Sequence, residues 1–180
     1  PIVREVLKYF NINFPIEIPT FSDIPGSTGL GSSSSFAVGL INAISALIKK
    51  KLSKKKIAEI AASIEIDKLK RKIGVQDHYS AAVGGLNLLN FKKNNSVVIT
   101  KIKNQSFKKI KKLERELVLV FTKQTRNASD ILSKQYKPTN SQTKDLSLMK
   151  NEVIKFKNFF LSQSLDAKLF GKMLTNQWKL

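Results

Sequence analysis

The sequence has no cysteine and only one histidine, His78, among its 180 residues. The missing cysteines exclude a disulfide framework, a thiolate nucleophile and cysteine-ligated zinc or iron–sulfur sites. A single histidine also disfavours a metal site built from imidazole groups. No apolar run approaches the length of about 18 residues that spans a bilayer, and the N-terminus lacks the order of a signal peptide. We therefore expect a cytoplasmic protein with no membrane partner.

Arginine is scarce although the chain is strongly basic, with a formal net charge of +19. Only four of its 32 basic residues are arginines, at positions 4, 71, 115 and 126. Base-edge recognition depends largely on the bidentate arginine fork, and the aromatic residues do not alternate with the basic runs as stacking platforms would. These features disfavour specific nucleic-acid binding. The apolar fraction of 42% is too high for a disordered polybasic chain, so a hydrophobic core is expected.

The spacing of apolar residues predicts the α+β class, in which strands and helices are mixed. The expected helices are 1–10, a buried helix from Phe36 to Ile48, 54–70 with Ser53 as N-cap, 128–135, and 146–180 with an interruption near Ser164. The expected strands are 14–21, 96–102 and a buried strand at 116–122. Loops or linkers are expected at 25–35, in the GVQDHY segment, and at 103–115 and 138–145. The order of elements predicts two domains, 1–115 and 116–180.

The most informative segment is the loop at 25–35, PGSTGLGSSSS, which runs directly into the buried helix. The first N–H groups of a helix have no intrahelical partner, and the helix dipole favours an anion there. Glycines in the loop let the backbone approach a phosphate closely, and the serine hydroxyls add donors. The alternative is a flexible Gly/Ser linker. It is not a Walker A loop, because no Gly-Lys-Ser/Thr follows the glycines.

The pattern P-x-x-x-G-L-G-S-S at 25–33 resembles the ATP-binding signature of the GHMP kinases. Two further segments are similar to the sugar kinases of the heptose 7-phosphate kinase type, namely IEIDKLKRKIGVQDHYSAAVGGLNLLNF at 64–91 and LVLVFTKQTRNASDIL at 117–132. The resemblance implies a GHMP kinase fold. Its N-terminal domain is of the S5-like type and its C-terminal domain is ferredoxin-like, and both would be incomplete here.

The resemblance also implies cofactors, substrates and roles for individual residues. The cofactors would be ATP and Mg²⁺, and the acceptor a sugar or sugar phosphate, with D-glycero-D-manno-heptose 7-phosphate favoured over the fucose or galactose type. Asp77 would be the general base that accepts the proton of the attacking hydroxyl. Ser33 and Glu65 would bind magnesium, and Gln76 and Arg126 would lie near the substrate. The ATP phosphates would be bound by Pro25, Gly29, Leu30, Gly31, Ser32, Ser33 and Ser34.

Simpler interpretations of the same residues stay open. From spacing alone, Glu65 is equally well a solvated carboxylate on a helix. By itself, Asp77 in a Gly-flanked loop is more often a turn residue than a base, and the alternative for Arg126 is a residue that caps or flanks a helix start. His78, next to Asp77 in an expected extended loop, is expected to point away from it and receives no catalytic role.

The sequence departs from the family at both ends. It lacks the R-x-x-x-G-G-G-T-D segment with which the sugar-phosphate branch begins and the K-x-x-G-A-G-G-G-G-F segment near its end. We therefore expect an internal piece of a longer kinase that has little activity by itself. Two alternatives of another class are a basic nucleic-acid-binding domain and a degenerate GHMP-fold protein that binds nucleotide without turnover.

Overall fold

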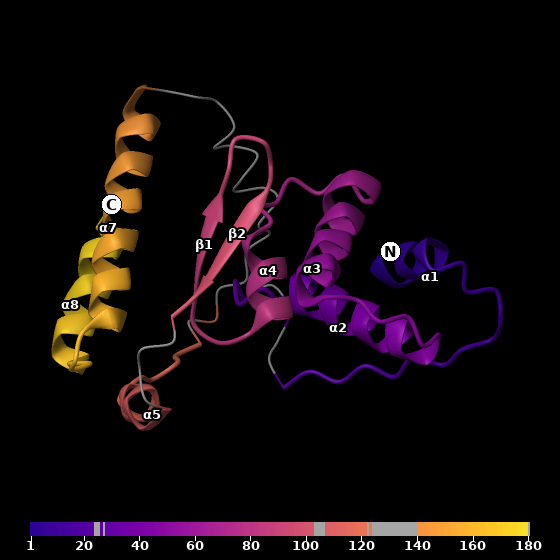
Figure 1. Ribbon diagram of the computed structural model, residues 1–180, viewed down its shortest axis with the longest axis horizontal. Helices are drawn as coiled ribbons and strands as arrows, with labels where there is room; N and C mark the ends of the chain where they lie inside the picture. The colour runs from indigo at the N-terminus through magenta and orange to yellow at the C-terminus, as the bar shows by residue number, and fades with distance from the viewer. Residues whose placement is uncertain (24–25, 27, 103–106, 122, 124–139, 180) are drawn as a thin grey trace. The chain divides into compact units, whose positions relative to one another are not determined.

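The computed structural model describes residues 1–23, 26, 28–102, 107–121, 123 and 140–179 (Figure 1). It consists of helices and one small antiparallel sheet, which agrees with the predicted α+β class. The chain divides into two compact units, one formed by residues 1–85 with 121–136 and the other by 86–120 with 137–180. None of the helices within the described residues is long and apolar enough to cross a bilayer.

The first unit is built on helices α1 (Ile2–Tyr9), α2 (Ser32–Leu47), α3 (Lys54–Ser63) and α4 (Gln76–Val83). Apolar side chains recur on α2 at helical spacing, so one face of this helix enters the core. The core residues that are less than 4% exposed in these helices, and at Ile64 directly after α3, are Val6, Ala37, Ile41, Ile44, Ala58, Ile60, Ala61 and Ile64. The predicted buried helix is therefore confirmed, but it begins at Ser32, four residues before Phe36.

Helix α3 begins at its predicted cap and ends in an unusual turn. The Ser53 hydroxyl accepts a hydrogen bond from the Lys56 N–H at 3.2 Å, which satisfies one of the free donors of the first turn. The helix then widens into the π-helical turn η1 (Ile64–Lys68). Such turns often occur at functional sites. Here the turn carries Glu65, whose side chain is completely buried.

Two predictions for the first unit are wrong. The segment at 14–21 is not a strand, because Pro15 and Pro19 lack N–H donors and none of the described strands lies beside it. Its alternation has another basis, since Ile16 and Ile18 pack against the helical core. The GVQDHY segment is not wholly a loop, because Gln76 begins helix α4.

The second unit contains a β-hairpin and a separate helical cluster. Strands β1 (Asn87–Phe91) and β2 (Val97–Lys101) pair antiparallel, with Leu89 opposite Ile99, and β2 confirms the strand expected at 96–102. The helices are α5 (Phe107–Arg115), α7 (Asn140–Leu161) and α8 (Ala167–Trp178). Leu113, Phe159 and Met173 form the core of this cluster. The predicted interruption near Ser164 is confirmed, and Asp166 caps α8 by accepting the Lys168 N–H at 2.8 Å.

Three predictions for the second half of the chain are wrong. The buried strand expected at 116–122 is not formed by its described residues, 116–121, because no described strand pairs with them, and these residues are exposed. The lysine-rich connector contains helix α5, whose apolar side places Leu113 in the helical core. The expected linker at 138–145 is helical from Asn140. The helix expected at 128–135 lies outside the described residues, and the ferredoxin-like character of the C-terminal part stays a prediction.

Candidate functional site

The start of α2 is arranged to receive an anion. Gly29 and Gly31 have φ angles of +79° and +69°, a left-handed conformation that glycine adopts without the steric cost of a Cβ atom. The first turn contains Ser32, Ser33 and Ser34 and no acidic residue. The first turn itself therefore contributes no carboxylate to the positive end of the helix dipole, which favours an anion.

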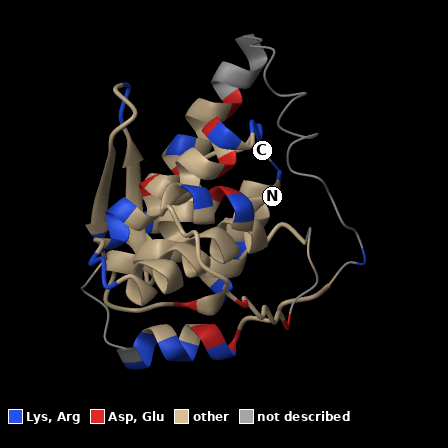
Figure 2. Ribbon diagram, turned by 90° about the vertical axis from the view of Figure 1, so that its right-hand side faces the viewer, with Lys and Arg blue, Asp and Glu red and all other residues tan. Residues whose placement is uncertain are grey.

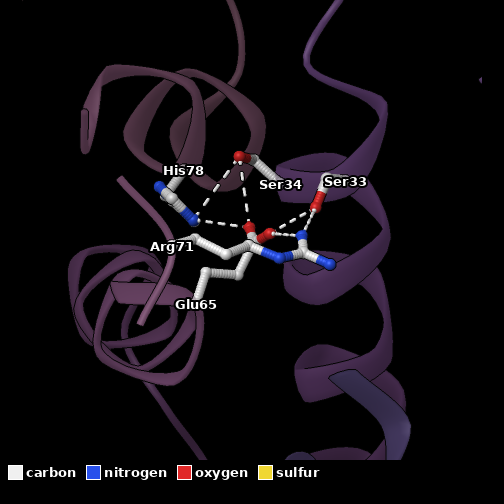
Figure 3. A network of polar contacts seen from close by, with 5 residues as sticks. All are labelled: Ser33, Ser34, Glu65, Arg71 and His78. Carbon is white, nitrogen blue, oxygen red and sulfur yellow. Dashed lines mark hydrogen bonds and ion pairs between the residues drawn. The ribbon is translucent and has the colours of Figure 1, made fainter. Parts of the chain in front are cut away.

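Behind this turn lies a polar network centred on Glu65 (Figure 3). Ser33 Oγ donates a hydrogen bond to Glu65 Oε1, and Arg71 Nη1 donates to the same oxygen. Glu65 Oε2 lies 2.8 Å from His78 Nε2 and 3.4 Å from Ser34 Oγ. Each oxygen of this carboxylate thus has two partners, which come from three different segments of the chain.

The network determines the protonation of Glu65. Burial alone would raise the pKa of this carboxyl group, since a charge is poorly solvated in the protein interior. Hydrogen bonds from His78 and Ser33, together with the attraction of His78 and Arg71, outweigh burial and bring the pKa below the ordinary value of 4.5. Glu65 is therefore a carboxylate at neutral pH. Its negative charge is compensated by Arg71, whose side chain is 34% exposed.

Asp77 lies at the start of α4 and borders the N-terminal end of α2. A Cβ atom placed on Gly31 would lie 3.4 Å from Asp77 Cβ, Cγ and Oδ2. The Asp77 side chain is exposed, and so is the neighbouring Gln76. An exposed carboxylate thus lies beside a helix N-terminus, a kind of position that favours phosphate.

We expect the substitution Gly31→Ala to lower the free energy of unfolding by about 1–2 kcal/mol, because a Cβ atom is strained at positive φ. Chemical denaturation of the variant and the parent measures this difference. Gly39 lies within α2, has no positive φ, and leaves open space for a Cβ atom, so Gly39→Ala is the matched control. A control that loses as much stability as Gly31→Ala would contradict the explanation.

The structure brings several of the sequence-predicted residues together. Ser33, Ser34 and Glu65 meet in one network, while Asp77 borders Gly31. Leu30 is exposed beside the same turn. Pro25 and Arg126 lie outside the described residues.

Sequence reasoning missed Arg71 and His78. The expectation that His78 points away from Asp77 is confirmed, since His78 is completely buried whereas Asp77 is exposed, but the sequence did not reveal that His78 contacts Glu65. Its other ring nitrogen, Nδ1, has no hydrogen-bond partner among the described residues, so Nε2 is the atom that anchors the ring. A helix at this position would have indicated the arrangement, because successive residues on a helix lie about 100° apart. On α4, Asp77 can therefore face solvent while His78 faces the core.

The oxygen atoms of Ser33 and Glu65 fit the chemistry of magnesium, which prefers hard oxygen ligands. The described residues contain no group of three or more His, Cys, Asp and Glu side chains that could hold a metal by themselves. A magnesium ion would therefore depend on this hydroxyl–carboxylate pair together with phosphate oxygens or water.

Comparison with known proteins gives a family match for the first part of the chain and several related kinases. Residues 1–85 match the family of GHMP kinases N terminal domain. The sequence-based resemblance is thereby confirmed. No solved structure gives a significant match.

Three curated kinases show significant similarity to this chain. It is 32% identical to D-glycero-alpha-D-manno-heptose 7-phosphate kinase of Campylobacter jejuni, over 99% of this chain and 52% of that kinase. It is 37% identical to mevalonate kinase of Saccharolobus solfataricus, over 47% of this chain and 26% of that enzyme. It is 33% identical to mevalonate kinase of Methanocaldococcus jannaschii, over 61% of this chain and 31% of that enzyme. The chain thus spans about half the length, or less, of these relatives.

Proposed function

We propose that this chain is the nucleotide-binding and catalytic part of an ATP-dependent sugar or sugar-phosphate kinase. The observation that carries the proposal is the position of the Asp77 carboxylate beside Gly31 at the N-terminus of α2. The match of residues 1–85 to the family of GHMP kinases N terminal domain supports it independently. We also propose the division into domains at 1–115 and 116–180, and a cytoplasmic location.

In the proposed reaction, the α2 N-terminus and the loop from Gly29 to Ser34 bind the phosphates of ATP. Asp77 accepts the proton of the sugar hydroxyl, whose oxygen then forms a bond to the γ-phosphorus as the bond to ADP breaks. Gln76 and Arg126 position the acceptor. Magnesium, held by Ser33 and Glu65, would neutralise phosphate charge when bound.

The favoured acceptor is D-glycero-D-manno-heptose 7-phosphate. The similarity over nearly the whole chain to a kinase named for this class of substrate supports the choice. The other two relatives are named for mevalonate, and they match shorter parts of the chain. Hexoses such as galactose and fucose are the alternatives to be tested beside the heptose phosphate.

Calorimetric titration of the chain with ATP and Mg²⁺ tests the proposal, and we expect saturable binding of one nucleotide per chain. The full-length gene product should then transfer the γ-phosphoryl group of ATP to the heptose phosphate in preference to galactose, fucose and mevalonate. Binding of nucleotide without transfer to any acceptor would favour a degenerate kinase. Failure to bind ATP, combined with salt-sensitive retention on DNA, would favour the nucleic-acid-binding alternative.

A further inference from the structure

Arg71 contacts both side chains that are proposed to bind magnesium. Its Nη1 atom lies 2.5 Å from Ser33 Oγ and donates a second hydrogen bond to Glu65 Oε1 (Figure 3). These two oxygens also contact each other. A guanidinium nitrogen thus binds the two oxygens that a divalent cation would need.

The backbone around Arg71 directs its side chain to this position. The residue before it, Lys70, has a φ angle of +55°, which is uncommon for a residue with a Cβ atom. The Arg71 N–H then donates to the Glu65 carbonyl oxygen at 3.0 Å, which closes the chain back onto η1. Strained backbone of this kind persists where the surrounding structure holds it in place, and it often marks functional sites.

The rest of the network leaves one carboxylate oxygen of Glu65 available to a metal ion. Its Oε2 atom is occupied by His78 and Ser34, both of which are buried. The Oε1 atom, which Arg71 and Ser33 contact, is the remaining one. Arg71 is also the more accessible partner, since about a third of its side chain is exposed whereas Glu65 is completely buried.

We propose that Arg71 is the resident cation of this site and competes with a divalent metal ion for Ser33 Oγ and Glu65 Oε1. This inference rests on the proposed function, because it uses the proposed metal ligands. Two positive charges repel each other at one carboxylate oxygen, so binding of the metal releases the guanidinium. Ser33 belongs to the first turn of α2, so the released guanidinium remains beside the end of the helix that receives the phosphates. There its planar fork of donors suits a phosphate group.

The consequence is a site that disfavours the bare metal ion and favours the metal together with nucleotide. The metal alone must displace Arg71 and leave its charge unpaired. When ATP binds at the same time, the released guanidinium gains a phosphate partner, so the two binding events support each other.

The substitution Arg71→Met tests this with effects of opposite sign. We expect the variant to bind Mn²⁺, the probe for the divalent cation, about tenfold more tightly than the parent in the absence of nucleotide. We expect it to bind ATP in the presence of saturating Mg²⁺ about fivefold more weakly, because no released guanidinium is left to contact a phosphate. Electron paramagnetic resonance of free Mn²⁺ and calorimetry of ATP measure the two constants. A purely structural role for Arg71 would not move them in opposite directions.

Two further variants complete the design. Lys72 is exposed and adjacent, so Lys72→Met removes the same charge without touching the network and should leave both constants nearly unchanged. Arg71→Lys keeps the positive charge and should keep the Mn²⁺ affinity near that of the parent. If Arg71→Met binds Mn²⁺ no better than the parent, the competition is wrong.

The failure of this inference can be separated from failure of the proposed metal site. Glu65→Gln should remove Mn²⁺ binding in the parent and in Arg71→Met alike. Loss in Glu65→Gln without any gain in Arg71→Met would overturn the role of Arg71 alone, whereas Mn²⁺ binding that is indifferent to Glu65 would overturn both. If Arg71→Met does not fold, the ¹⁵N side-chain signals of the four arginines in the parent decide the question. The Arg71 signal should shift when Mg²⁺ and ATP are added, and an unchanged signal would contradict the release.

Discussion

Replacing Glu65 by alanine is expected to lower the free energy of unfolding by about 3–5 kcal/mol, the cost of breaking a buried ion pair by removing one partner. The variant leaves His78 completely buried without its carboxylate, and it removes the common acceptor of Ser33 and Arg71. Urea denaturation followed by circular dichroism measures the difference. Glu59, whose pair with Lys56 spans 3.6 Å at the surface, is the matched control. Glu59→Ala should cost less than about 1 kcal/mol.

The pH dependence of the same experiment checks the cause. The pKa of Glu65 is lowered on folding, so its stabilising contribution is fully present above the ordinary value of 4.5. It is lost as the pH falls from that value through the lower folded pKa. The difference between the parent and Glu65→Ala should therefore shrink in acid and stay constant toward neutral pH. A difference that grows on acidification would mean that the network does not stabilise the carboxylate.

Replacing Asp77 by asparagine is expected to lower kcat by about 10²- to 10⁴-fold, the range for the loss of a general base. Asparagine has nearly the same size, so the contact with Gly31 and the start of α4 are retained. The assay follows phosphoryl transfer by the full-length gene product, with ATP affinity measured separately and expected to change less than about twofold.

The control for this substitution is Asp67→Asn, which removes the same charge from an exposed position in η1. Its kcat should match that of the parent. If Asp77→Asn turns over as fast as the parent, Asp77 is not the base. If it loses ATP affinity as strongly as it loses kcat, its role is in nucleotide binding instead.

The glycine turn that leads into the buried helix α2 could be predicted because its signals are local. The glycines at 29 and 31 and the apolar spacing from Phe36 onward report on conformation within a few residues. The start of α2 was misplaced because four consecutive serines have no apolar periodicity. Only the packed structure shows that they belong to the first turn.

The Arg71 contact could not be predicted, because it depends on a π-helical turn and a positive φ at Lys70, neither of which has a clear sequence signal. The apolar run at 117–121 illustrates the opposite error. Its composition favours a strand, but a strand also needs a partner, and among the described residues the run has none. Lysine and arginine residues recur on several helices and do not gather in one segment (Figure 2).

The exposed run Leu117–Phe121 has a consequence for handling the purified protein. Its five consecutive apolar residues are each at least 49% exposed, and such β-prone segments promote association between chains. At low ionic strength the net charge of +19 keeps chains apart by repulsion. In about 1 M salt the screening length falls to roughly 3 Å, and this protection is lost. High-salt purification and salting-out crystallisation therefore favour precipitation, whereas dilute buffers preserve a dispersed sample.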